Sequence, residues 1–473
     1  MFKKYISQKI KDKLFQINEV ISVTIVGSFN DRSDLQHIGD IDVVVILNKI
    51  NKKNFNKCNK KINSLNDFIL KKTKKSILIN NTLGPIKYDY NKFTVIHLMI
   101  YDKKSHKKHV LLSPFTCFDW ERSKNYKGLS LKEIYPVRFL ILEDFISSRR
   151  SPNDYIKDID ANSISYRKYY FNKSGYYLKK LKYKFNEINK INYAYHIIKN
   201  LLFNYYKFEN NINKLISSKE QKKLFLKITN NKNLYNEFIK IKSYRSIKKN
   251  NIEQVKEIVI KFLNHFNNFI ITIKKNNEIV FIRHNKTLYN DGTFFGQGRD
   301  TNKITVQKNK LLIKKKFDIC FSSPLKRALE TSKIYSTRKI IKINELKEIN
   351  YGRAEGLNLT KLKKKYPKII DMWNSNLDPR FPSGENNKDV IDRLQVFLKK
   401  LTSNKKFYNK KILVVTHNVL LRSLLGSVFD MKIHEWYKIQ INFSDFFEFL
   451  IINKKIIPNI SRIKLEKLTK SGN

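Results

Sequence analysis

The sequence predicts a multidomain α/β protein in which a helical middle region separates two α/β parts. Its 473 residues exceed what one hydrophobic core usually organises. Apolar runs of strand length alternate with helical patterns near both ends of the chain. Residues 113–275 instead carry apolar residues at three- and four-residue spacing and almost no glycine. We therefore expect three regions, with boundaries at 1–112, 113–275 and 276–473.

The first region begins with an amphipathic helix and continues as a small α/β domain. Ile6, Ile10, Leu14 and Ile17 recur at helical spacing, so one apolar face is expected to pack on the domain itself rather than on a membrane. Later apolar runs are of strand length and are separated by helical and Lys/Asn-rich stretches. The expected strands are Val23–Val26, Ile41–Leu47 and Phe93–Tyr101.

The other two regions differ in the period of their apolar residues. In the middle region, Tyr177–Phe185 and Tyr193–Phe208 are expected to be helical. In the last region, Ile412–Val415 is continuously apolar, as expected of a sheet covered on both faces. We expect a three-layer α/β domain there with a mostly parallel sheet. Its expected strands are Ile279–Ile282, Phe317–Phe321, Lys411–Thr416 and Phe446–Ile452.

The charge of the chain favours anionic ligands. Lys and Arg total 95 against 41 Asp and Glu, a formal net charge of +54. The lysines are scattered along the chain, which is typical of a general compositional bias, so a nucleic-acid partner is an alternative and not the favoured interpretation. Cys58, Cys117 and Cys320 lack metal-like spacing and are expected to be free thiols. Without a signal-peptide core or a long apolar run, a cytoplasmic protein with no membrane partner is expected.

Polar residues follow several expected strands of the last region. Arg283 and His284 follow the first strand, Arg327 lies shortly after the second, and His417 follows the third. Ligands bind at the carboxyl ends of strands in such folds, so these side chains are expected to converge. A neutral imidazole can attack phosphorus, and paired arginines match phosphate oxygens. A carboxylic acid would still be needed to protonate the leaving oxygen.

The order of these blocks resembles the histidine phosphatase (phosphoglycerate mutase-like) superfamily. The resemblance implies that His284 is the nucleophile and Glu348 the proton donor, and that a phosphorylated small molecule is the substrate, without a cofactor. It also assigns phosphate binding to Arg283, Asn290, Arg327 and His417. The matching blocks are Arg283–Asn285 with Thr287 and Asn290, Ser322–Ala328, Leu346–Gly352 with Glu355–Leu357, Pro382–Glu385 with Arg393, and Val414–Asn418.

Some positions depart from the pattern of this family. Asn285 replaces the signature glycine, Lys286 replaces a frequent acidic residue, and Arg353-Ala354 replaces a tryptophan-containing pair. None of these changes removes a catalytic group. The stretch from Gly356 to Gly384 is short, whereas similar cofactor-dependent mutases carry a longer insertion there. A phosphatase is therefore preferred to a mutase.

A second motif lies in the first region. Gly27-Ser28 follows an apolar strand, and Asp40 and Asp42 come one residue apart on the next, so both carboxylates share a face. Such a pair can hold Mg²⁺ against a nucleoside triphosphate. The pattern resembles the polymerase-β-type nucleotidyltransferase superfamily, which would make Gly27 and Ser28 nucleotide-binding and the two aspartates metal-binding. His97 stands where that family has a third carboxylate.

The missing third carboxylate leaves two alternatives for the first region. It can be a non-catalytic nucleotide-binding domain that regulates the phosphatase. The whole chain can also be a nucleic-acid-processing nucleotidyltransferase with an accessory phosphatase, in which the basic surface holds RNA. The leading hypothesis from the sequence is a phosphomonoester hydrolase fused to a nucleotidyltransferase-like domain.

Overall fold

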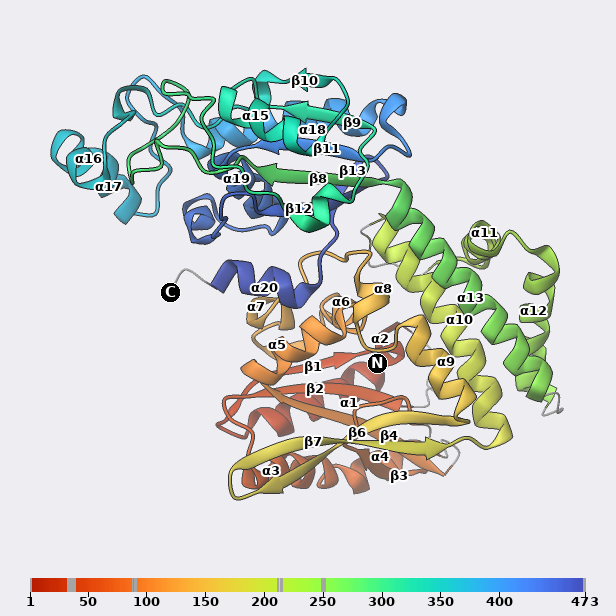
Figure 1. The fold of residues 1–473 in the computed structure, drawn as a ribbon. Helices are drawn as coiled ribbons and strands as arrows, with labels where there is room; N and C mark the ends of the chain where they lie inside the picture. The colour runs from red at the N-terminus through yellow and green to blue at the C-terminus, as the bar shows by residue number, and fades with distance from the viewer. Residues whose placement is uncertain are drawn as a thin grey trace. The chain divides into compact units, whose positions relative to one another are not determined.

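The computed structural model describes residues 2–31, 40–86, 88, 92–210, 212, 216–247 and 252–470. The chain forms two compact units (Figure 1). Unit 1 comprises Met1–Leu140 and Asp144–Phe269, and unit 2 comprises Ile141–Glu143 and Ile270–Asn473. Residues 113–140 and 144–269 therefore pack in the same unit as the N-terminal sheet.

Unit 1 is built on a five-stranded sheet of order β3-β4-β2-β1-β5. β2 and β3 each pair parallel with β4, whereas β1 pairs antiparallel with both β2 and β5. All three strands expected from the sequence are present, because each apolar run falls inside an observed strand. The strands are β1 (Val20–Val26), β2 (Asp40–Leu47), β3 (Ser76–Asn80), β4 (Phe93–Asp102) and β5 (Tyr126–Gly128).

The first helix packs on this unit as its spacing predicted. Ile6, Ile10 and Leu14 of α1 (Phe2–Phe15) are buried, and the helix contacts β1 and α3. α5 contacts β4 and β2, so the sheet is also covered near the C-terminal part of β4. The next helices are α2 (Ser28–Asp31), α3 (Lys52–Asn63), α4 (Asn66–Thr73), α5 (Lys103–Leu112), α6 (Pro114–Trp120) and α7 (Leu131–Ile134).

The prediction of a helix at Tyr177–Phe185 was wrong. β6 (Ser163–Asn172) and β7 (Gly175–Lys184) form an antiparallel hairpin, and only Tyr193–Phe208 lies in a helix, α10. The tyrosine-rich strands favour sheet geometry, and Tyr170 stacks on Tyr177 across the hairpin with ring centroids 5.7 Å apart. The remaining helices are α8 (Asp144–Ser147), α9 (Pro152–Asp160), α10 (Glu187–Asn210), α11 (Ser218–Thr229), α12 (Lys232–Ile247) and α13 (Ile252–Asn276).

Unit 2 is built on a six-stranded, mostly parallel sheet of order β10-β9-β11-β8-β12-β13. β8, β9, β10 and β11 run parallel, and β12 and β13 are antiparallel to their neighbours. The four strands expected from the sequence each coincide with one of these. Their bounds are β8 (Glu278–Arg283), β9 (Ile319–Ser322), β10 (Ile340–Lys342), β11 (Ile412–Thr416), β12 (Phe446–Ile452) and β13 (Lys455–Pro458).

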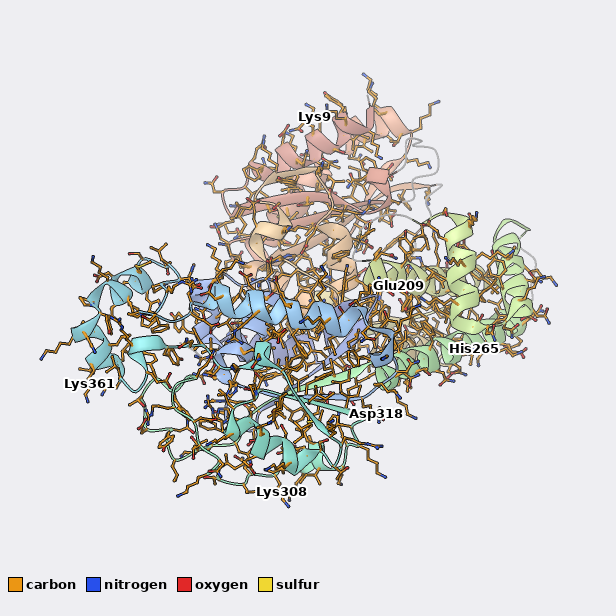
Figure 2. The ribbon with its side chains drawn as sticks, turned by 90° about the horizontal axis from the view of Figure 1, so that it is seen from above. Lys9, Glu209, His265, Lys308, Asp318 and Lys361 are labelled. Carbon is orange, nitrogen blue, oxygen red and sulfur yellow. The ribbon has the colours of Figure 1, made fainter. Side chains whose placement is uncertain are left out.

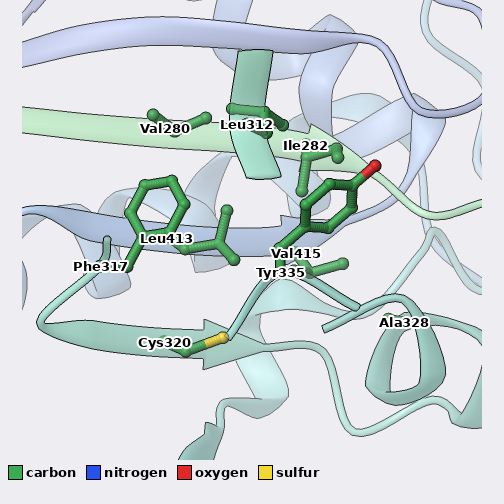
Figure 3. Close-up of a cluster of buried hydrophobic side chains, with 9 residues drawn as sticks. All are labelled: Val280, Ile282, Leu312, Phe317, Cys320, Ala328, Tyr335, Leu413 and Val415. Carbon is green, nitrogen blue, oxygen red and sulfur yellow. The ribbon is translucent and has the colours of Figure 1, made fainter. Parts of the chain in front are cut away.

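Helices cover both faces of this sheet, as the continuous apolar strands predicted. On one face, side chains of β8, β9 and β11 form a buried cluster with α14 and α15 (Figure 3). On the other face, Phe321 packs edge-on against Phe397 of α18. The helices of unit 2 are α14 (Lys310–Ile313), α15 (Lys326–Tyr335), α16 (Leu359–Lys365), α17 (Pro367–Asn374), α18 (Asn387–Ser403), α19 (Asn418–Val428) and α20 (Arg462–Lys470), with 3₁₀ turns η1 (Asn344–Leu346), η2 (Gly352–Ala354), η3 (Lys405–Phe407) and η4 (Ile433–Lys438).

The cysteines and the lysines differ in their exposure. Cys58, Cys117 and Cys320 are buried and free of disulfides. Lysines such as Lys308 and Lys361 are exposed and lie at the periphery of unit 2 (Figure 2). A search of the helices in the described ranges finds none that is both long and apolar enough to cross a membrane.

Candidate active site

The residues predicted to act in unit 2 meet at the carboxyl edge of its sheet. His284 follows β8, and its backbone N–H donates to the carbonyl of Thr416 in β11 at 2.9 Å. His417 follows Thr416, and the two imidazole centroids are 5.0 Å apart. The parallel register of β8 and β11, which pairs Arg283 with Thr416, is what brings the two strand ends together.

The ring of His284 is held with one nitrogen available. Its Nδ1–H donates to its neighbour's carbonyl, that of Asn285, at 2.7 Å, so Nε2 carries the lone pair. The side chain is 3% exposed. Burial, reinforced by the charges of Arg327 and Arg283, holds the pKa of His284 well below its ordinary value of 6.5. A neutral imidazole with a free Nε2 can act as a nucleophile.

The second histidine is fixed by a serine. His417 is fully buried, and its Nε2 lies 2.8 Å from Ser323 Oγ, while Nδ1 has no hydrogen-bond partner among the described residues. Burial and the nearby charge of Arg327 lower the pKa of His417 well below its ordinary value. In the sequence, Ser323 stood out only as one residue of the Ser322–Ala328 motif. No sequence pattern indicated that its hydroxyl would hydrogen-bond to His417.

The fully buried Arg327 and the half-buried Arg283 supply positive charge near His284. Arg283 donates to the carbonyl of Ile441 at 2.6 Å and lies over the ring of Phe443, with 3.8 Å between Cζ and the ring centroid. Arg327 donates to the carbonyl of Gly296 at 2.7 Å and forms an ion pair with Asp300 at 3.2 Å. The Nε of each arginine has no partner within the described part of the chain.

Both guanidinium groups are costly to bury and are therefore expected to serve a ligand. Burial lowers the pKa of Arg283 to about 10 and also lowers that of Arg327, while the charge of Glu348 works against both shifts. A phosphoryl group would accept hydrogen bonds from the Nε atoms of both arginines and would add negative charge beside Arg283, for which no ion pair is found among the described residues. This arrangement agrees with the phosphate-binding role that the resemblance gave to these residues.

Glu348 is buried, and its carboxylate lies against the N-terminus of α19. Its carboxylate accepts hydrogen bonds from the backbone N–H groups of Ile349, Asn418 and Val419 at 3.0, 3.0 and 3.1 Å. Burial raises the pKa of Glu348, and the Ile349 N–H and nearby arginines oppose the shift without cancelling it. The raised pKa favours a protonated carboxyl that can donate to a leaving group.

A half-buried ion pair fixes the loop that carries Glu348. Arg393 of α18 donates to Glu385 at 3.0 Å and to the backbone carbonyl of Glu348 at 3.1 Å. Gln297 also donates to that carbonyl, at 2.7 Å. Glu385 and Arg393 belong to motifs of the sequence, but no role was predicted for either residue. In the structure they position the loop that carries Glu348.

Asn290 is placed differently from the other predicted residues. Its side-chain oxygen accepts hydrogen bonds from the backbone N–H and the hydroxyl of Thr287, at 2.7 and 3.0 Å. None of its described hydrogen bonds reaches the two histidines or the two arginines. In this structure Asn290 closes the turn after His284, and a direct contact with phosphate stays a prediction.

The departure at Asn285 is accommodated by packing. Its backbone is not among the described positions with positive φ, so this turn does not require glycine. The side chain is fully buried, accepts a hydrogen bond from Ser444 at 2.6 Å and donates to the carbonyl of Gln307 at 3.3 Å. Asn285 therefore ties the nucleophile loop to two distant segments.

The motif predicted in unit 1 is also assembled. Gly27 and Ser28 follow β1, and the register of β1 with β2 pairs Val26 with Asp42. Gly27 has φ of +72°, and a Cβ at this position would lie 2.3 Å from Asp42 Oδ2. The close approach therefore requires glycine. Asp40 and Asp42 lie on the same face of β2, as their spacing predicted.

His97 occupies the position beside the aspartates that its place in the sequence indicated. Its Nδ1 is 2.8 Å from Asp42 Oδ1, and its Nε2 is 2.6 Å from the carbonyl of Thr82. Both partners accept hydrogen bonds, so both ring nitrogens carry protons. Burial acts to lower the pKa of His97, but the hydrogen bond and charge of Asp42 outweigh it, and the pKa is raised.

These residues line one end of a cavity of about 460 Å³ within unit 1. Gly27, Ser28, Asp40, Asp42 and His97 all contribute to its wall, together with side chains from the helical middle of the chain. No group of three or more His, Cys, Asp or Glu side chains able to hold a metal is found in the described ranges. Two carboxylates still fit Mg²⁺ when substrate phosphates complete its coordination.

Comparison with known proteins finds a family match in the C-terminal region of the chain. Residues 279–445 match the model of the histidine phosphatase superfamily (branch 1). The chain is 28% identical over 201 residues to a 2,3-bisphosphoglycerate-dependent phosphoglycerate mutase of Methanococcus vannielii, covering 34% of this chain and 86% of the relative. It is 35% identical over 115 residues to the uncharacterized phosphatase PhoE of Bacillus subtilis, covering 24% of this chain and 53% of the relative.

Among solved structures, the alpha-ribazole phosphatase from Shigella flexneri aligns with 22% sequence identity. The alignment covers 39% of this chain and 95% of that one, with a TM-score of 0.34. The match to the superfamily model spans β8 with His284, the start of α15 with Arg327, the Glu348 loop and the end of β11 with His417. The C-terminal region of this chain therefore matches the histidine phosphatase superfamily over residues 279–445.

Proposed function

We propose that unit 2 hydrolyses phosphomonoesters through a phosphohistidine intermediate on His284. The observation that carries the proposal is the hydrogen bond from Nδ1 of His284 to the carbonyl of Asn285, which leaves Nε2 as the nitrogen able to attack, while burial and the charges of Arg327 and Arg283 lower the pKa of this ring. The substrate is a phosphorylated small molecule held by Arg283, Arg327 and His417, with Asn290 at the adjoining turn. This route uses no metal.

In the first half of the proposed reaction, Nε2 of His284 attacks phosphorus and a P–N bond forms. The bond between phosphorus and the ester oxygen breaks, and the Glu348 carboxyl gives its proton to that oxygen as it leaves. The arginine donors stabilise the charge that spreads over the remaining phosphoryl oxygens. The free alcohol departs, and Glu348 is left as a carboxylate.

In the second half, a water molecule attacks the phosphohistidine. The Glu348 carboxylate takes a proton from that water, the P–N bond breaks, and inorganic phosphate is released with neutral His284. The backbone N–H groups of Asn418 and Val419 at the start of α19 stabilise the carboxylate between the two halves. Both catalytic groups then return to their starting protonation states.

Hydrolysis is favoured over mutase chemistry by the short stretch between Gly356 and Gly384. In this chain it holds only the two small helices α16 and α17. Relatives of both kinds match the chain, because one is named a mutase and another a phosphatase. Assays for release of inorganic phosphate and for movement of phosphate within phosphoglycerate, run side by side, separate the two activities.

The test of the phosphatase is a panel of sugar phosphates, nucleotides, phosphorylated alcohols and p-nitrophenyl phosphate. We expect His284→Ala to lose nearly all turnover and to trap no acid-labile phosphoenzyme from labelled substrate. His434→Ala is the matched control, because this histidine of η4 lies in the same unit and outside the proposed site. Undiminished turnover in His284→Ala would overturn the proposal.

For unit 1 we propose a second activity, the transfer of a nucleotide from a nucleoside triphosphate. It is supported by the close approach of Gly27 to Asp42 and by two carboxylates on one strand face. Asp40 and Asp42 would hold Mg²⁺, which when bound would neutralise the phosphate charges. The Gly27–Ser28 turn would bind the triphosphate, and His97 would orient Asp42.

Labelled nucleoside triphosphates in Mg²⁺ provide the test of this second activity. We expect label transfer that Asp40→Asn abolishes, while phosphate release by unit 2 stays unchanged. Binding of nucleotide without transfer would instead support a non-catalytic domain that regulates the phosphatase. Detection of a covalently labelled product therefore distinguishes a transferase from a non-catalytic nucleotide-binding domain.

A further inference from the structure

The cavity of unit 1 extends well beyond the aspartate pair. His97, Met99 and Tyr101 alternate along β4 and all line it, so the cavity follows one face of this strand. Tyr101 lies four residues from His97, which places the two positions about 13 Å apart along an extended strand. The end of the cavity at Tyr101 is thus distinct from the end at Asp40 and Asp42.

Buried polar atoms without partners mark this far end. The hydroxyl of Tyr101 and both ring nitrogens of His109 are buried and have no hydrogen-bond partner among the described residues. The two side chains are 2% and 7% exposed, and their ring centroids are 5.1 Å apart. Leaving such buried groups unpaired is unfavourable, so they are expected to serve a ligand.

Three arginines line the same cavity. Arg149 and Arg150 come from the segment between α8 and α9, and Arg167 comes from β6. Within the described ranges, none of the three guanidinium groups forms an ion pair with a carboxylate. Burial and the neighbouring charge of Arg167 lower the pKa of Arg149 to about 10. Burial also lowers the pKa of Arg167.

The backbone holds two of these arginines in place. Arg167 exchanges two backbone hydrogen bonds with Leu83, at 2.8 and 3.1 Å, which fixes this part of β6 against the loop after β3. Arg150 has φ of +62°, a conformation that is unfavourable for a residue with a side chain and that clusters at functional sites. The positive charge is therefore held by the fold and is not a chance surface arrangement.

The acidic groups in the cavity do not neutralise this cluster. Asp119 is paired with Lys207 at 2.6 Å, and Asp42 is paired with His97. Asp40 and Asp144 also line the cavity and have interactions of their own. None of these four carboxylates forms an ion pair with Arg149, Arg150 or Arg167 in the part of the chain that the structure describes.

We propose that Tyr101, His109, Arg149 and Arg167 form a subsite for an oxyanion, the phosphoryl or carboxylate group of a small molecule bound in unit 1. Two guanidinium forks supply paired donors, and the tyrosine hydroxyl and one imidazole N–H supply neutral ones. Arg150 lines the same cavity and adds a further positive charge. The rest of the molecule would extend along β4 toward Asp42. The subsite goes beyond the proposed nucleotide transfer and does not require it.

Trp120 provides a local signal for binding, because it stacks on His109 with ring centroids 5.1 Å apart. We propose to titrate the full chain with inorganic phosphate and, separately, with acetate at constant ionic strength, and to record tryptophan fluorescence. The part of the change that Trp120→Phe removes belongs to this cavity. Tighter phosphate binding indicates a phosphorylated ligand, and tighter acetate binding a carboxylate ligand.

Arg149→Gln and Arg167→Gln should each weaken the Trp120-dependent binding at least tenfold. Arg167→Lys, a milder change that keeps the charge and loses the fork, should lie between. Lys168→Gln is the matched control, because this neighbouring residue of β6 is exposed and its removal should leave binding unchanged. Saturable binding that all these variants share equally, or no signal from Trp120 with either anion, would overturn the subsite.

The same titrations separate this subsite from the activities proposed above. His284→Ala should leave the Trp120 signal intact, because His284 belongs to unit 2. Asp40→Asn should likewise leave phosphate binding at the far end unchanged even where it abolishes nucleotide transfer. Failure of transfer with intact anion binding would refute the transferase alone, and the reverse result would refute the subsite alone.

Discussion

The pKa values of the two residues proposed to be catalytic in unit 2 are shifted in opposite directions by the same burial. Burial disfavours the charged form of any group, so it lowers the pKa of His284 and raises that of Glu348. Burial therefore favours the neutral imidazole of His284 and the protonated carboxyl of Glu348. The proposed mechanism needs these two states together, because one group attacks while the other donates.

The first prediction concerns the pH profile of kcat/KM. The acid limb, where His284 gains a proton, should lie below pH 6.5, because its pKa is depressed. The alkaline limb, where Glu348 loses its proton, should lie above pH 4.5, because its pKa is raised. The measurement is kcat/KM against pH after the ionisation of the substrate is divided out. A profile unchanged by Glu348→Gln in its alkaline limb would contradict the assignment.

The second prediction concerns the leaving group. Glu348→Gln keeps the shape of the side chain and removes the transferable proton. Hydrolysis of an alkyl phosphate should fall about 10²–10⁴-fold, whereas p-nitrophenyl phosphate, whose leaving oxygen needs little protonation, should be affected much less. Equal losses with both substrates would show that the substitution disturbs the fold of the loop rather than proton donation.

At the scale of elements, the site depends on how strands and loops are joined. The end of β8 is held to β11 by the bond from His284 to Thr416, and the Glu348 loop is held to α18 by Arg393. The two histidines are thus positioned by the sheet, whereas the acid is positioned by an ion pair. Rigid elements of this kind keep reacting groups in the geometry that transfer requires.

The third prediction tests the core beneath these strands. Leu413 of β11 is fully buried in the cluster drawn in Figure 3. Leu413→Ala should reduce the stability of unit 2 by about 2–5 kcal/mol, through lost burial and the cavity left behind. Urea titration followed by phosphatase activity measures it. Val396→Ala on α18, where the side chain is 47% exposed, is the control and should change the midpoint little.

At the scale of the whole molecule, the excess of basic residues creates a field that attracts anions. The net charge of +54 is spread along the chain. The local clusters act inside that field: Arg283 and Arg327 in unit 2, and Arg149, Arg150 and Arg167 in unit 1. The affinity for phosphate-bearing small molecules is raised both by the net charge of the chain and by the paired donors of these arginines. The affinity for a nucleic acid is raised chiefly by the net charge.

The fourth prediction separates these two kinds of binding. A generic RNA should bind at low salt and lose affinity steeply between 50 and 200 mM salt, by about 10³–10⁵-fold if six to ten phosphates are contacted. Gel-shift titrations over this range measure the slope. RNA binding that persists at 200 mM salt with sequence preference would instead support the nucleic-acid-processing alternative.

Local sequence patterns were sufficient to predict features that depend on neighbouring residues. Apolar runs predicted β1, β2 and β4 of one sheet and β8, β9, β11 and β12 of the other, and the residues just after β8 and β11 predicted the two histidines of the site. The short or edge strands β3, β5, β10 and β13 were not predicted. Where two periods were both present, the pattern was ambiguous. Tyr177–Phe185 fits helical spacing, but β6 directly upstream pairs with it and makes it a strand.

Contacts between distant segments could not be predicted in this way. The sequence alone determined the order of the phosphatase-like blocks, whose resemblance to a known family gave the candidate nucleophile and acid, and it placed the aspartate pair on one strand by its spacing. Only the tertiary structure decided that Asn290 closes a turn, that His97 bridges Asp42 and Thr82, and that Tyr101, His109 and the arginines share one cavity. Those arrangements join residues from separate strands, helices and loops, and their geometry exists only after the elements have packed.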